Sequence, residues 1–176
     1  MKTRFILTIV SLTLFSYCGQ KVSSEEVKVD NSITEGQGVG QFRVNETTLD
    51  DITKTLGNTY ETVLYEDGRL EFNYKDLGLA FYYDSKKTIT VILLRQPFSG
   101  QSNKGIGLNS TLDEVIKAYG PPEWSTPCKT CDTWTARYKG IEFVIDRDKA
   151  LPKFPFDEQT HLKKRISEIF VYKTGA

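Results

Sequence analysis

The helical segment that decides the fold occurs twice in this chain. Residues 47–57 read TTLDDITKTLG and residues 110–120 read STLDEVIKAYG, an offset of 63 residues. In each stretch a Thr precedes a Leu and two acidic residues, the start signal of a helix whose first turn carries negative charge. Apolar residues then recur at helical spacing until Gly57 ends one helix and Gly120 the other.

A second match follows each of these helices at nearly the same distance. Residues 77–84, LGLAFYYD, align with residues 139–146, KGIEFVID, at an offset of 62. Two matches at almost one offset indicate an internal duplication.

Extended segments complete each copy. The sequence predicts strands over residues 70–75, 77–83 and 88–95 in the first copy, and over 133–138, 140–146 and 165–172 in the second. A tight turn at residues 84–87 has its counterpart in an insertion of residues 147–164, and loops of that length are often functional or mobile. The expected fold class is α+β: two tandem helix-plus-antiparallel-sheet units, each with one sheet face left to be solvated, packed on the sister unit or used for binding.

The N-terminus has the order of an export signal. Lys2 and Arg4 precede an apolar run over residues 5–15, which is too short to span a membrane, and Cys18 follows. A cysteine at this point is typical of the lipid-modified residue of a bacterial lipoprotein, although Tyr17 stands where a small residue is usual. We therefore expect a signal peptide over residues 1–17 and a lipid anchor on Cys18. Ordinary secretion is the alternative, but no small-x-small cleavage site ends the run.

The rest of the chain divides into three parts. Residues 18–37 are mostly polar and are expected to form a flexible tether, with a flexible lead-in around Gly36 to Gly40. The first repeat then covers residues 38–98 and the second residues 99–176, with a linker at 97–105. Apart from the signal peptide no long apolar segment is present, so contact with a membrane is expected only through Cys18.

Charge excludes one class of partner. Two of the 23 basic residues belong to the signal peptide, so the mature chain has 21 basic against 23 acidic residues and no long block of either sign. Nucleic acid binding needs a concentrated positive surface, and none is visible here.

Two further cysteines, Cys128 and Cys131, are spaced as Cys-Lys-Thr-Cys. A zinc site needs four ligands, and the sequence has neither a second Cys pair nor a His pair to complete one. A thioredoxin-like motif would open a helix, whereas this pair lies between a Gly-Pro-Pro turn and a predicted strand. We expect a local disulfide that closes this loop, with a free or redox-active pair as the alternative.

Catalytic sets are not evident. His161 is the only histidine and lies in the polar insertion, where we expect it to be exposed. The acidic pairs at 50–51 and 113–114 are explained as partners of the helix dipole. We expect no enzyme activity, no metal and no cofactor.

A family resemblance can be placed on the second copy. It carries Gly107, Leu112, Val115, Tyr119, Gly120, Pro122, Trp134 and Tyr138. This pattern resembles the SmpA/OmlA module, which occurs in the small outer-membrane lipoprotein of the β-barrel assembly machinery. The same unit in tandem resembles the β-lactamase inhibitor protein. The first copy keeps the helix and Gly57 but lacks the prolines. The resemblance implies an α+β fold and the binding of proteins, but no particular partner.

Aromatic residues off the core face are the candidates for protein binding. If Leu79 and Phe81 point inward, Tyr82 points to the other face of its strand. Phe170 and Tyr172 share a face of the last strand, and Trp124 follows the Pro-Pro turn. Exposed aromatic residues are typical interface anchors, although all four residues could instead pack between the two units.

The sequence therefore predicts a lipid-anchored protein-binding module of the cell envelope, on the outer membrane, facing the periplasm or the exterior. Outer-membrane assembly or maintenance is one such role. The alternatives are an inhibitor or redox-responsive sensor of an exported protein, and a surface-exposed lipoprotein that contacts a host.

Overall fold

The computed structural model describes residues 30–66, 68–125, 132–146 and 156–174. In these residues the fold is α+β, with a large antiparallel sheet and few helices. The strand order of the eight-stranded sheet is β4-β5-β6-β7-β11-β10-β9-β8.

The first half of the eight-stranded sheet is a meander that follows a helix. Its elements are α1 (Leu49–Leu56), β4 (Glu61–Leu64), β5 (Leu70–Tyr74), the 3₁₀ turn η1 (Lys75–Leu77), β6 (Leu79–Tyr83) and β7 (Ile89–Leu94). The three predicted strands of this half are confirmed as β5, β6 and β7. Strand β4 was not predicted, because its four residues are all exposed and lack a buried alternate face.

The second half also has a helix followed by four strands, with a short helix before the last strand. Its elements are α2 (Leu112–Tyr119), β8 (Glu123–Ser125), β9 (Thr133–Tyr138), β10 (Ile141–Asp146), α3 (Glu158–His161) and β11 (Ile166–Tyr172). The last strands of the two halves, β7 and β11, pair antiparallel at the centre, where Leu94 lies opposite Ile169. One continuous sheet therefore joins the two halves.

Helices α1 and α2 begin with the same N-terminal capping arrangement. The hydroxyl oxygen of Thr48 accepts a hydrogen bond from the backbone N–H of Asp51, and the carboxylate of Asp51 accepts one from the backbone N–H of Thr48. Thr111 and Glu114 form the same reciprocal pair at the start of α2. These capping boxes satisfy donors that a helix start leaves free. The helix starts predicted for both segments are confirmed.

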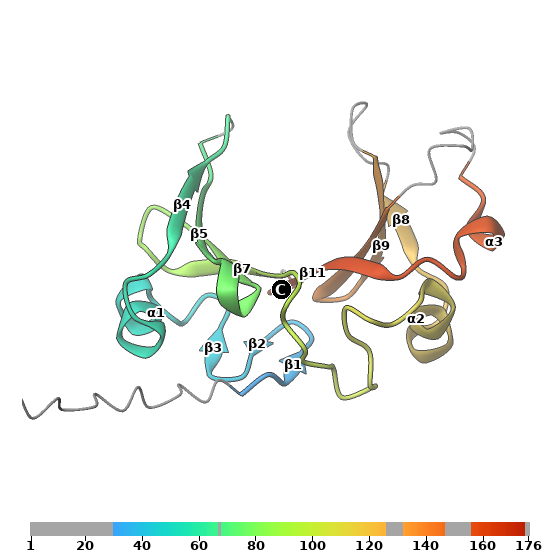
Figure 1. Cartoon of the computed structure of the whole chain (residues 1–176), viewed down its shortest axis with the longest axis horizontal. Coiled ribbons are helices and arrows are strands. Elements are labelled where there is room, and N and C mark those ends of the chain that lie inside the picture. The colour runs from blue at the N-terminus through green and yellow to red at the C-terminus, as the bar shows by residue number, and fades with distance from the viewer. Residues whose placement is uncertain (1–29, 67, 126–131, 147–155, 175–176) are drawn as a thin grey trace, which may run out of the picture.

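The eight-stranded sheet is strongly curved (Figure 1). At its two ends β4 and β5 on one side, and β8 and β9 on the other, rise in the same direction. Helices α1 and α2 and a small three-stranded sheet all cover the opposite side. We call the uncovered side of the eight-stranded sheet the concave face.

A small three-stranded sheet includes residues that were predicted to be a flexible tether. It consists of β1 (Ile33–Thr34), β2 (Gly38–Val39) and β3 (Phe42–Arg43). Ile33 is 2% exposed and Val39 is fully buried, so residues expected to be a flexible tether and lead-in belong to the folded core. The prediction failed because these apolar residues are scattered among polar ones and show no period over so short a stretch.

The main core lies between the eight-stranded sheet and the elements that cover it. It contains Phe42 from the small sheet, Ile52 and Leu112 from the helices, and Phe81 and Phe143 from the sheet. The linker expected at residues 97–105 is also packed, because Phe98 and Ser102 are buried and the carbonyl of Gln101 accepts from Ile33. One core therefore spans both halves of the chain.

The end of the insertion also differs from expectation. His161 was predicted to be exposed, but α3 buries it to 3% exposure. Its ring lies 4.9 Å from that of Phe156, which in turn contacts Trp124 and Trp134. Nδ1 of His161 lies 2.7 Å from the carbonyl oxygen of Asp157. The end of the polar insertion thus contributes aromatic side chains that pack against the core of the second half.

Candidate binding face of the eight-stranded sheet

Strand register decides which side chains occupy the concave face. Phe81 and its neighbour Ile92 point into the main core, so the adjacent Tyr82 and Leu93 point to the opposite side. Across the central junction Leu93 lies opposite Phe170, and Phe170 lies opposite Glu142. The concave face therefore continues from one half of the sheet into the other.

A second apolar cluster lies on this face. Ala80, Tyr82 and Leu93 are buried in it, although no helix of the described chain covers them. The side chains packed against them are Tyr65, Val91 and Phe170, which are themselves only partly buried. The guanidinium of Arg69 lies 5.4 Å from the ring centre of Tyr65 and 5.6 Å from that of Tyr82. Aromatic rings and a cation thus share one surface, as in many protein interfaces.

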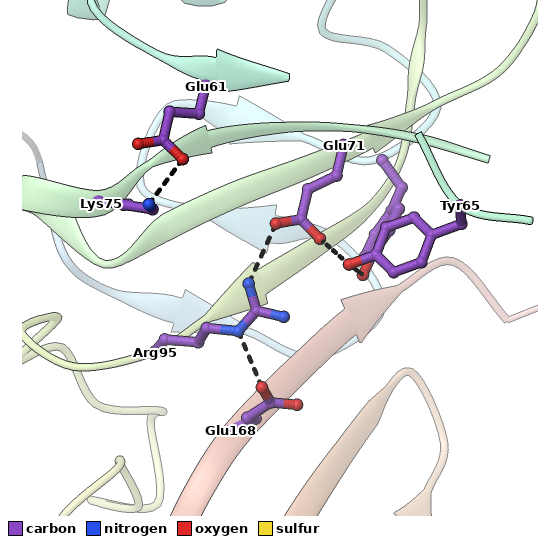
Figure 2. Close-up of polar contacts among 7 residues, drawn as sticks. Glu61, Tyr65, Glu71, Lys75, Arg95 and Glu168 are labelled. Carbon is purple, nitrogen blue, oxygen red and sulfur yellow. Dashed lines mark hydrogen bonds and ion pairs between the residues drawn. The ribbon is translucent and has the colours of Figure 1, made fainter. Parts of the chain in front are cut away.

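A polar network crosses the concave face (Figure 2). Arg95 follows β7, and its guanidinium donates to Glu71 on β5 at 3.0 Å and to Glu168 on β11 at 2.8 Å. The other carboxylate oxygen of Glu71 accepts from the hydroxyl of Tyr65 at 2.6 Å. The hydroxyl of Tyr82 donates to that of Tyr65 at 3.3 Å. Arg95 therefore ties the two halves of the sheet together on their open side.

Glu71 is the buried member of this network, with its side chain only 1% exposed. Burial raises the pKa of its carboxyl group, but hydrogen bonds from Tyr65 and Tyr82 and the charge of Arg95 outweigh burial, and the pKa lies below its usual value. For Arg95, burial lowers the pKa, while Glu168 and Glu71 raise it by more, so its net shift is upward. Both groups are therefore charged at neutral pH.

The second half of the concave face is more open. Nε of Arg137 on β9 contacts Glu142 on β10 at 3.1 Å, and Glu123 on β8 lies opposite Arg137. Together with Tyr138, Lys139 and Tyr172 they line a hollow of about 590 Å³. This part of the face offers charges of both signs beside tyrosine side chains.

The four predicted aromatic residues lie in two places. Tyr82, Phe170 and Tyr172 all lie on the concave face. Tyr82 is only 7% exposed because neighbouring rings cover it, whereas Phe170 is half-buried. The hydroxyl of Tyr172 donates to the carbonyl of Tyr138 at 3.2 Å. Trp124 instead packs against the main core, and its indole N–H donates to Glu158 at 3.2 Å.

Sequence reasoning did not find Glu71, Arg95 or Glu168. Alternation in β5 places Glu71 on the face opposite Phe72, and this was the available signal. The ion pairs of Arg95 had no signal in the sequence, because Arg95 is 24 residues from Glu71 and 73 from Glu168. Cys18, Cys128 and Cys131 lie outside the described residues, so their lipid and disulfide remain predictions.

Across residues 30–66, 68–125, 132–146 and 156–174, no group of three or more His, Cys, Asp or Glu side chains could hold a metal ion. Within the same residues no helix is long and apolar enough to cross a membrane.

The fold and this face define an α+β protein in which one curved antiparallel sheet is covered on one side and open on the other. The chain belongs to the family described as "Domain of unknown function (DUF4309)", which matches residues 26–156. No curated protein matches the sequence.

Two solved structures are similar to this one. The first is the uncharacterized protein yfeY from Escherichia coli, with a TM-score of 0.58 and 16% identity over 83% of this chain and 99% of that chain. The second is a DUF4309 family protein (YjgB) from Bacillus subtilis subsp. subtilis str. 168, with a TM-score of 0.46 and 16% identity over 78% of this chain and 88% of that one. At such identity the likeness to yfeY concerns the fold alone.

Proposed function

We propose that this protein is a lipid-anchored protein of the cell envelope that binds a protein partner with the concave face of its sheet. The observation that carries the proposal is the charged and aromatic network around Arg95, which occupies an uncovered sheet face. A side of a sheet that no helix covers is normally solvated and polar. Here it instead carries buried aromatic and aliphatic side chains beside a buried carboxylate.

We further propose that the two halves are copies of one unit, as in the SmpA/OmlA-like resemblance. Tyr74 donates from its hydroxyl to the carbonyl of Gly57 at 2.9 Å, and Tyr138 donates to that of Gly120 at 2.8 Å. The register shifts between Tyr82 and Tyr83 in one half, and between residues 144 and 145 in the other. Shared caps, bulges and hydrogen bonds support duplication more strongly than sequence matches do.

The duplication gives each concave residue a counterpart. In the register of the second half, Thr135 takes the place of Glu71, Val144 that of Tyr82, and Tyr172 that of Arg95. The second half forms the same meander without these charges, so the fold does not require the network. A buried ion pair also stabilises a fold little compared with apolar packing. Recognition of a partner is the role we assign to it.

The position of the N-terminus fits presentation of this face. The first described residues lead into β1, on the side of the molecule opposite the concave face (Figure 1). Asp30 is twelve positions after Cys18, and a fully extended chain over that distance spans at most about 40 Å. A lipid on Cys18 would therefore hold the domain near the bilayer by its covered side and leave the concave face turned away.

Photo-crosslinking in the native cells tests the binding face. We expect p-benzoylphenylalanine in place of Phe170, on the concave face, to crosslink one defined protein. The matched control places the same group at Lys54, which is exposed on α1. Equal crosslinking from both positions, or none from Phe170, would contradict the proposal.

The identity of the crosslinked protein separates the possible roles. Components of the barrel-assembly machinery would support a part in outer-membrane assembly. One exported enzyme would indicate an inhibitor, and a partner lost on reduction of Cys128 and Cys131 a redox-responsive sensor. A host protein would indicate a surface lipoprotein.

The anchor has its own test. Replacing Cys18 with serine removes the thiol that would carry the lipid. Each acyl methylene contributes about 0.8 kcal/mol of membrane binding, so loss of the chains should release the domain. We expect Cys18→Ser to move the protein out of the membrane fraction, while Cys128→Ser leaves it there. An unlipidated wild-type chain, read by mass spectrometry, would contradict the anchor.

A further inference from the structure

The two edges of the eight-stranded sheet are treated differently. At one edge, β8 has three residues, and Trp124 on it is held by Phe156 and Glu158 from the region of α3. At the other edge, no strand or helix of the described chain pairs with the outer side of β4. Proteins usually shorten, cover or charge such edges because a free edge invites another strand. Within the described residues, β8 is thus packed against a neighbouring segment and β4 is not.

The exposed residues of β4 are suited to pairing. All four are exposed, and Leu64 (69%) and Val63 (36%) are among the most exposed large apolar side chains of the described chain. Its register with β5 is regular, from Glu61 opposite Asn73 to Leu64 opposite Leu70. No bulge twists this edge away from an incoming strand.

The direction of the free backbone groups follows from the hairpin. The N–H of Tyr65 donates to the carbonyl of Arg69 at 2.9 Å, so this pair is a hydrogen-bonded one. Because such pairs alternate along an antiparallel ladder, Val63 and Glu61 also bond inward to β5. The N–H and C=O groups of Thr62 and Leu64 therefore point outward, which makes two donors and two acceptors in a row.

We propose that β4 is a docking edge at which an extended segment of a partner protein adds a ninth strand to the sheet. Only an extended backbone presents donors and acceptors at the spacing of such a row. Two copies joined edge to edge would meet over only four residues each. The area buried between them would be far below the roughly 1,200 Å² of a stable interface. A partner strand has no such limit, because it can continue onto the concave face, toward which Val63 points. This inference does not depend on the network around Arg95.

The test uses a substitution that blocks the edge but spares the ladder. Proline at position 62 removes an N–H that points outward, and proline is tolerated on edge strands in that orientation. Thr62→Val is the matched control, because it keeps the N–H and the β-branched shape. The probe is a displayed library of random linear twelve-residue peptides, selected on the mature wild-type chain.

We expect selected peptides to alternate apolar and polar residues, to bind Thr62→Val as they bind the wild type, and to bind Thr62→Pro at least tenfold more weakly. They should also slow hydrogen exchange at the amides of Thr62 and Leu64. A second blocked variant, Leu64→Lys, covers the case in which Thr62→Pro does not fold. Three results would overturn the proposal: no enriched peptide, peptides that bind the blocked variants as tightly, or a wild-type dimer that either variant makes monomeric.

The two proposals can fail separately. Loss of crosslinking from Phe170 with intact peptide binding at β4 would contradict only the proposal for the concave face. The reverse outcome would contradict only the proposal for the docking edge.

Discussion

Replacing Arg95 with methionine should lower the free energy of unfolding by about 3 kcal/mol. The change leaves the carboxylate of Glu71 buried, with the hydroxyls of Tyr65 and Tyr82 as its remaining donors. Removing one partner of a buried ion pair costs about 3–5 kcal/mol, and the retained hydrogen bonds place this case at the lower end. Urea denaturation of the mature chain measures the change.

Two control variants identify the cause. Glu168→Gln removes the more exposed partner of Arg95 and should cost less than about 1 kcal/mol. Adding Glu71→Leu to Arg95→Met removes the stranded charge and should restore most of the loss. If Arg95→Met costs no more than Glu168→Gln, the buried ion pair does not have the energetic role assigned to it.

The same network predicts a pH dependence. The pKa of Glu71 is lowered in the folded state, so its ionised form stabilises the fold at pH values above its ordinary pKa of 4.5. That contribution is lost as the pH falls through the lowered folded pKa. We expect the wild type to lose stability over this acidic range and Glu71→Gln to lose less, measured by urea denaturation at a series of pH values.

Periodic segments of the chain were predictable, and the reason is physical. The helix start signals at Thr48 and Thr111 and the alternation in β5 and at the start of β10 depend only on neighbours in sequence. The small N-terminal sheet was missed because Ile33 and Val39 owe their burial to distant elements. Ile33, for example, bonds to Gln101. The prediction for His161 failed for the same reason, since Phe156, which lies against its ring, and the tryptophans that Phe156 contacts come together only in the fold.

The candidate face was only partly predictable. Alternation alone placed Tyr82 on the side opposite Phe81, and the structure agrees. The order β7-β11 at the centre of the sheet could not be read from the sequence, and this junction brings Arg95 to Glu168. Residues that share a face within one strand are thus predictable, whereas pairs across the junction need the topology.

The shared core carries the last prediction, which concerns cooperativity. Phe81 in the first half and Phe143 in the second are fully buried, and each lies against aromatic partners. Truncating either to alanine should cost about 3–5 kcal/mol of unfolding free energy. Because one core and one sheet span both halves, we expect either change to destabilise the whole domain rather than its own half.

The two tryptophans make this measurable, because both lie in the second half of the chain. Their fluorescence reports unfolding of that half, whereas far-ultraviolet circular dichroism reports the whole chain. We expect Phe81→Ala to shift both urea transitions together, by as much as Phe143→Ala does, while Phe81→Leu shifts them much less. A tryptophan transition that Phe81→Ala leaves unmoved would show two independently folding repeats, because destabilisation would then stop at the β7–β11 junction.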